Sequence, residues 1–96
     1  MADLKANLLS ELAEYVAVLS LGLEATKRAE DRSAYTSHLA EAAVIFRYLM
    51  QSDLSMAHER VMAEQHAYGR SFLDGDAGQA AEAAFAKLLK SFARSG

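Results

Sequence analysis

The stretch Leu4–Leu23, LKANLLSELAEYVAVLSLGL, decides the fold class of this chain. An α-helix turns by about 100° per residue, so the large apolar side chains of this stretch gather on one face. A broad apolar stripe of this kind is typical of an amphipathic helix that packs against a core. We therefore predict a helix from about Asp3, a plausible N-cap, to about Arg28. Its stripe consists of Leu4, Leu8, Leu9, Leu12, Tyr15, Val16, Leu19 and Leu23.

The same spacing predicts three further helices. The second runs from about Ser33 to Gln51, after the charged break KRAEDRS, and the third from the segment SDLS at 52–55 to about Gly69. Neither Pro nor Gly separates these two, so one long bent helix is the alternative. The fourth follows the turn Asp74-Gly75 and is capped by Asp76. The predicted core stripe of the second helix is Tyr35, Leu39, Ala42, Ala43, Phe46, Leu49 and Met50.

The composition fits a single small domain that covers residues 1–96. The chain has 96 residues and no Pro, and its short loops favour helices that are neighbours in space. We predict an all-α fold, a small antiparallel bundle of about four helices. The formal charge of −3 argues against a nucleic-acid partner. The absence of Cys removes disulfides and thiolate metal sites.

The amino-terminal segment predicts a cytoplasmic protein with no membrane partner. Acidic residues interrupt its leucines, unlike the apolar core of a secretory signal. The longest apolar-looking run, YVAVLSLGL at residues 15–23, is too short to cross a bilayer, which takes about 20 residues. We expect no cofactor.

Two of the three histidines lie in HERVMAEQH at 58–66, which raises the question of a metal site. A zinc-binding H-E-x-x-H helix needs histidines at positions i and i+4, on one face. Position i+4 from His58 is Met62, and His66 comes two turns later on another face. The simplest interpretation is a partly buried His58 and a solvated His66. A ligand or metal pocket in the bundle core, near His38 and His58, stays an alternative.

Arg60, His66 and Tyr68 form the pattern R-x5-H-x-Y. This pattern resembles the R-x4-6-H motif of HEPN-type ribonucleases, which are also small and all-α. The resemblance implies RNA cleavage by Arg60 and His66 meeting across a dimer. It covers about nine residues, and it departs from the family at Val61 and in the short length of the chain.

Apolar residues outside the core stripes predict a protein interface. Val18 and Leu21 in the first helix, and Val44 and Tyr48 in the second, lie off their stripes, and Ile45 is intermediate. A small bundle buries one stripe per helix, so a second apolar face needs a partner. The simplest partner is a second copy in a symmetric dimer, and another protein's amphipathic helix would also fit. We predict a non-enzymatic interaction module, a homodimeric regulator, adaptor or inhibitor.

Overall fold

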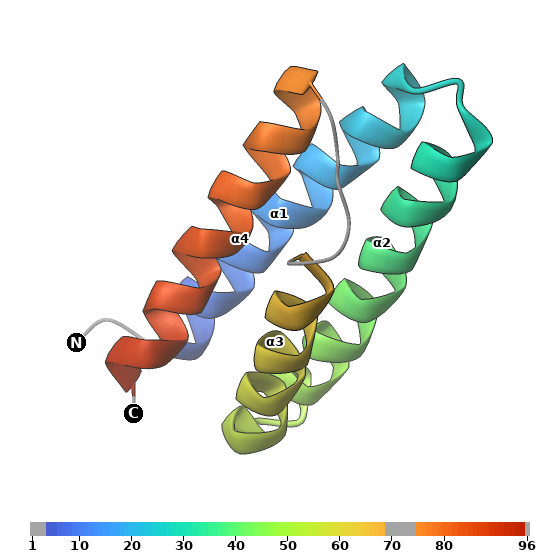
Figure 1. Cartoon of the computed structure of the whole chain (residues 1–96). Coiled ribbons are helices and arrows are strands. Elements are labelled where there is room, and N and C mark those ends of the chain that lie inside the picture. Colours follow the sequence, from blue (N-terminus) through green and yellow to red (C-terminus); the bar gives the residue numbers. More distant parts are fainter. Residues whose placement is uncertain (1–3, 69–74, 96) are drawn as a thin grey trace.

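Four α-helices account for nearly all of the chain that the structure describes. The computed structural model describes residues 4–68 and 75–95, and within these ranges it contains helices and no strand. The helices are α1 (Leu4–Ala25), α2 (Ala29–Met50), α3 (Leu54–Tyr68) and α4 (Gly75–Ser95). Figure 1 shows them as one bundle. The all-α prediction is confirmed.

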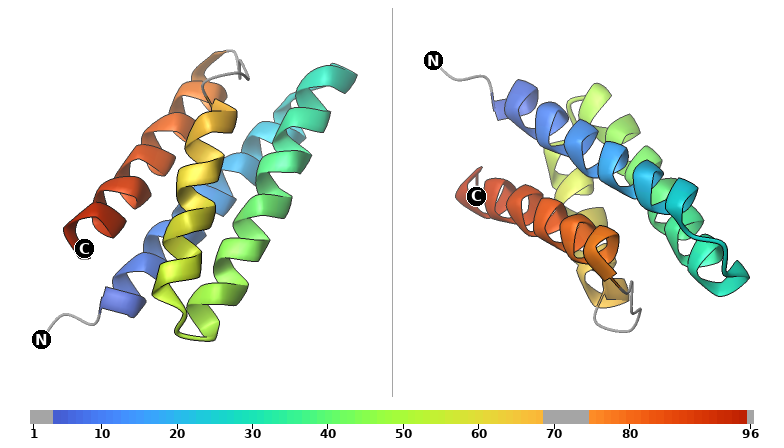
Figure 2. Two further views of the ribbon diagram at one scale, coloured as in Figure 1. Left: turned by 60° about the horizontal axis from the view of Figure 1, so that its bottom comes forward. Right: turned by 90° about the horizontal axis from the view of Figure 1, so that it is seen from above.

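Helix α1 lies at the centre of the packing. It packs along both α2 and α4, whereas α3 packs along α2 and touches α4 only briefly. The two views of Figure 2 show α1 beside both of these long helices. The Cα radius of gyration is 13.0 Å, close to the value of about 12.5 Å expected for a compact chain of this length.

The buried face of α1 follows the predicted spacing. Leu8, Leu12, Tyr15 and Leu19 are all buried, at alternating steps of four and three residues. Polar contacts on its flank join α1 to α4: Lys87 lies 3.3 Å from Glu14, and the Ser91 hydroxyl donates to Glu11. The complete core is Leu8, Leu12, Tyr15, Leu19, Tyr35, Ala42, Ile45, Leu49, Ala57, Val61, Ala81, Ala84, Phe85, Leu88 and Phe92.

By length and composition alone, α1 could also cross a membrane. The core helix of a soluble protein meets the same criterion, so this observation is weak evidence for a membrane segment. The apolar part of α1 is longer than the nine-residue run considered in the sequence, because the whole helix contributes to it. In the bundle, its buried apolar residues face α2 and α4, whereas Leu21 is exposed. The cytoplasmic location stays a prediction.

A short turn separates α2 from α3, so the two are not one bent helix. Ser52 adopts a left-handed conformation with φ of 59°. The amide of Ser52 donates to the Leu49 carbonyl at 3.0 Å, and the amide of Asp53 donates to the Tyr48 carbonyl at 2.9 Å. These two bonds form a Schellman motif, which ends α2. The side chain of Asp53 then accepts a hydrogen bond from the Met56 amide at 3.1 Å and caps α3.

Removal of this cap should weaken the bundle measurably. We expect Asp53→Ala to lower the free energy of unfolding by about 1 kcal/mol, because a helix amide loses its acceptor. Urea unfolding followed by circular dichroism measures the change. Ser55→Ala, on the exposed side of the first turn of α3, is the matched control and should change stability by less than about 0.5 kcal/mol. Equal losses in the two variants would contradict the capping role.

Several helix ends differ from the prediction. Helix α1 ends at Ala25 rather than near Arg28, and α2 begins at Ala29 rather than near Ser33. The predicted charged break is therefore mostly helical, since only residues 26–28 separate the two helices. Helix α4 begins at Gly75, so Asp76 lies within its first turn. The predicted cap at Asp3 and the residue Asp74 lie outside the described residues.

The buried face of α2 also differs from the predicted stripe. Tyr35, Ala42 and Leu49 are buried as predicted, but His38 and Ile45 complete the face. Phe46 and Met50, placed in the core by the sequence, are 50% and 53% exposed. The core prediction for Phe46 and Met50 is wrong, because α2 is apolar over most of its circumference and its packing against α1 and α3 selects the face.

Helices α1 and α2 approach each other closely at Gly22. A Cβ atom built on Gly22 would lie 2.4 Å from Cε1 of Tyr35 and 2.5 Å from its Cζ. The ring of Tyr35 therefore occupies the space that a side chain at position 22 would need. Burial of Tyr35, and secondarily the nearby carboxylate of Asp31, raise the pKa of its hydroxyl above the ordinary value. The tyrosine is thus held as a neutral packing group.

Candidate functional site

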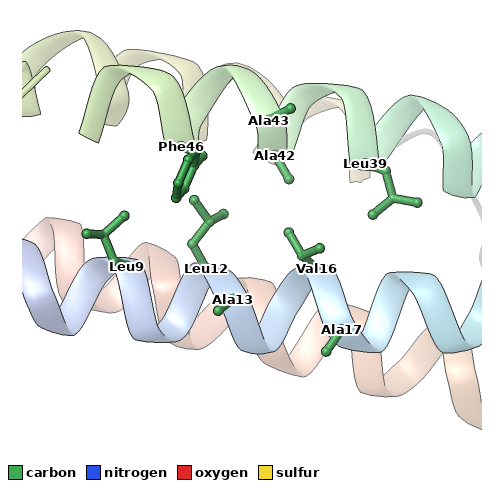
Figure 3. Close-up of a pocket in the computed structure, with 9 residues that line it drawn as sticks. All are labelled: Leu9, Leu12, Ala13, Val16, Ala17, Leu39, Ala42, Ala43 and Phe46. Atoms are coloured by element: carbon green, nitrogen blue, oxygen red, sulfur yellow. The ribbon is translucent and has the colours of Figure 1, made fainter. Parts of the chain in front are cut away.

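An apolar groove, which we call the outer groove, runs between α1 and α2 on the surface of the bundle. It has a volume of about 450 Å³. Figure 3 shows side chains from both helices converging on it, with Phe46 and Leu39 of α2 directed toward α1. Its lining is Leu9, Leu12, Ala13, Val16, Ala17, Leu39, Ala42, Ala43 and Phe46.

The outer groove exists because small residues stand where larger ones would fill the gap. Ala13 and Ala17 lie one turn apart on α1, and Ala43 lies opposite on α2. All three are exposed. The larger side chains form the walls, with Phe46 near Leu9 at one end. The result is a concave surface with bulky walls and a low alanine rim.

The outer groove offers apolar contact and no acid–base chemistry. No titratable residue is among its lining residues. Apolar surface continues beyond it, since Met50 lies one helical turn from Phe46, and Leu21, one turn from Ala17, is 65% exposed. A contiguous exposed apolar surface of this kind is typical of a binding face.

A second feature lies inside the bundle, and we call it the core polar cluster: Tyr15, His38 and Glu64. Both His38 and Glu64 are 3% exposed, and Tyr15 is fully buried. The His38 Nδ1 atom lies 3.1 Å from Oε2 of Glu64, within ion-pair distance. The Tyr15 hydroxyl donates to the same carboxylate oxygen at 3.4 Å. The cluster therefore joins α1, α2 and α3.

Glu64 was not among the residues predicted from the sequence, and His38 was named there only near an alternative pocket in the bundle core. In the structure His38 is buried on the inner face of α2. Glu64 follows Ala57 and Val61 at helical spacing on the buried face of α3. That spacing is the signal that could have identified it. A buried carboxylate needs a partner, and His38 is the partner that the fold supplies.

The five residues predicted for an interface have different environments. Leu21 is the most exposed of them, at 65%. Val18 and Tyr48 are partly buried and pack against the core, and Val44 is also partly buried. Ile45 is completely buried, because it lies one turn before Leu49 on the inner face of α2. A buried side chain offers no surface to a partner.

The residues that resemble the ribonuclease motif also have different environments. Arg60 forms an ion pair with Glu41 of α2 within the same chain. His66 is exposed near the end of α3. The side chain of Tyr68 lies outside the described part of the structure. Arg60 is thus engaged in holding α3 against α2, and the predicted meeting with His66 across a dimer stays a prediction.

His58 packs against an aromatic ring of the core. Its imidazole stacks on Phe92 of α4, with ring centroids 5.5 Å apart and an interplanar angle of 13°. The side chain is partly buried, as expected. Within residues 4–68 and 75–95, no group of three His, Asp or Glu side chains is placed to hold a metal ion. Neither His38 nor His58 lines the outer groove.

The geometry thus presents two features of different kinds. The outer groove is exposed and apolar, so it is suited to binding. The core polar cluster is enclosed, so it acts on the packing of the helices. Comparison of the chain with protein-family models, with curated proteins and with solved structures found no significant match.

Proposed function

We propose that this protein is a non-enzymatic, cytoplasmic interaction module that forms a homodimer through the outer faces of α1 and α2. The observation that supports it is the outer groove, an exposed concave surface lined only by apolar side chains. In this proposal α1 and α2 run antiparallel and pack against the same two helices of a second copy. A small regulator or adaptor of this type acts by presenting or masking the remaining surface.

The shape of this face supports a second copy as the partner. A two-fold symmetric interface requires a surface that is complementary to itself. The face carries the half-exposed Phe46, which forms a wall of the outer groove, and small residues at Ala13, Ala17 and Ala43 that let a second surface approach. In the two-fold dimer, Phe46 of each copy would pack against the alanine border of the other groove, so each contact would occur twice.

The size of the face is adequate for such a dimer. Helices α1 and α2 have 22 residues each, which corresponds to about 33 Å of length. Two helices of about 10 Å diameter side by side present a footprint of about 650 Å². Stable complexes bury about 800 Å² of accessible surface per partner, and the accessible area of a ridged surface exceeds its footprint. Burial of the exposed half of the Phe46 side chain adds about 1 kcal/mol per copy, roughly half the value for full burial.

The test is the mass in solution at micromolar concentration, measured by light scattering. We expect a dimer for the unmodified chain and a monomer for Phe46→Glu, because two carboxylates would be buried at an apolar contact. The matched control is Met62→Glu, on an exposed position of α3, which should stay dimeric. Helical circular dichroism should be the same for all three proteins.

Two results would overturn this proposal. One is a monomeric mass for the unmodified chain at these concentrations. The other is a dimer that survives Phe46→Glu but dissociates with Val44→Asp and Tyr48→Asp together. That second result would move the interface to another side of α2 and would favour the interface predicted from the sequence.

A further inference from the structure

Helix α3 buries fewer large apolar side chains than α4 does, although its partly buried Leu54 also packs against the core. Among its side chains at positions 54–66, the buried ones are Ala57, Val61 and Glu64. Two of these are small and the third is ionisable. By contrast, α4 buries Phe85, Leu88 and Phe92. Because apolar burial contributes in proportion to area, α3 gains less from docking than α4 does.

Helix α3 also packs against fewer neighbouring helices along its length than α1 does. It packs along α2 and only briefly against α4, whereas α1 packs along both α2 and α4. Removal of α3 would therefore leave the α1–α2 and α1–α4 interfaces in place. These two interfaces contain most of the large core residues, including Leu12, Leu19 and Leu88. The other three helices retain a shared apolar core.

Polar and ring contacts supply much of the remaining attachment. Glu64 reaches the two other members of the core polar cluster, Tyr15 and His38. Arg60 pairs with Glu41 of α2, and His58 stacks on Phe92 of α4. A buried carboxylate is stable only while its partners remain in place. When α3 leaves, that carboxylate returns to water, so loss of a partner favours the undocked state.

We propose that α3 is a detachable helix that undocks as a unit from α1, α2 and α4, with the core polar cluster as its latch. Undocking exposes the Tyr15 and His38 side chains and the apolar faces behind them, while the other three helices stay folded. Docked, α3 covers this inner surface. This inference is independent of the outer groove, which lies between α1 and α2 and includes no residue of α3.

Native-state hydrogen exchange of the full chain, read by mass spectrometry at low denaturant concentrations, tests the proposal. In the unmodified protein, we expect the amides in the middle of α3 to exchange at least about 10-fold faster than those in the middle of α1 and α4, through an opening smaller than global unfolding. Identical protection in α1, α3 and α4, all lost together with denaturant, would overturn it. This measurement needs no variant.

A variant then tests whether the core polar cluster holds α3 in place. His38→Leu removes the imidazole that lies beside Glu64, and we expect exchange in α3 to rise by at least about 100-fold, because a buried carboxyl loses its polar partner. The contact exists only in the docked state, so exchange in α1 and α4 through global unfolding should rise by the same factor, and α3 should remain the faster-exchanging helix. Met62→Ala, on the exposed side of α3, is the control and should leave α3 protection unchanged. Unchanged exchange in α3 of His38→Leu would contradict the role of the cluster.

Discussion

Gly22→Val should destabilise the bundle by about 3 kcal/mol, at the upper end of the range for overpacked cores. A Cβ atom at this position would already lie 2.4 Å from the Tyr35 ring, and valine adds two methyl groups to that overlap. Tyr35 is only 3% exposed, so displacement of its ring disrupts the packing between α1 and α2. Helices α1 and α2 would have to separate at their closest approach.

Urea unfolding followed by circular dichroism measures this loss. Ser20→Val, at an exposed position two residues earlier on α1, controls for the helix propensity of valine and should change stability by less than about 1 kcal/mol. Tyr35→Leu combined with Gly22→Val should recover at least about 1 kcal/mol relative to the sum of the single changes, because contacting residues couple. A fully additive pair would show that the ring contact is not the cause.

Phe92→Ala should cost about 3–5 kcal/mol, the loss typical of a buried phenylalanine. Phe92 is fully buried in α4, and its ring stacks on His58. The same change at Phe46, which is 50% exposed, should cost the isolated monomer less than about 1 kcal/mol, because much of its surface is already in water. These two phenylalanines thus have different energetic roles.

The dependence of the stability loss on protein concentration distinguishes a core phenylalanine from one at a dimer interface. The loss in Phe92→Ala should be the same at low and high concentration. The loss in Phe46→Ala should grow with concentration, because an association that favours the folded state depends on mass action. Chemical denaturation at two concentrations, 100-fold apart, makes the comparison. A concentration-independent loss for Phe46→Ala would contradict a role for this side chain in the dimer.

Much of the architecture was predictable because its causes are local. The heptad-like spacing of Leu8, Leu12, Tyr15 and Leu19 determines the inner face of α1, and no proline interrupts any helix. The turn at 51–53 was also within the predicted region, since Asp53 is a strong capping residue next to Ser52. Helix boundaries around residues 25–33 were less accurate, because charged residues there are compatible with helix as well as loop.

The candidate site was much less predictable, and α2 shows why. Its sequence is apolar on several sides, so periodicity alone placed Phe46 in the core and Ile45 at an intermediate position. In the structure Ile45 is fully buried and Phe46 lines the outer groove. Which side of α2 is buried depends on where α1 and α3 pack against it. The groove likewise needs alanines from two helices brought together.

The sequence by itself determined the four helices, the turn between α2 and α3 and the inner face of α1, because these depend on backbone preferences and on the spacing of nearby residues. Only the tertiary structure decided which side of α2 faces the core and which side lines the outer groove. It also decided that Glu64 of α3 meets His38 of α2 and Tyr15 of α1 in the core. Those contacts join segments far apart in the chain, and their energies exist only once the helices pack.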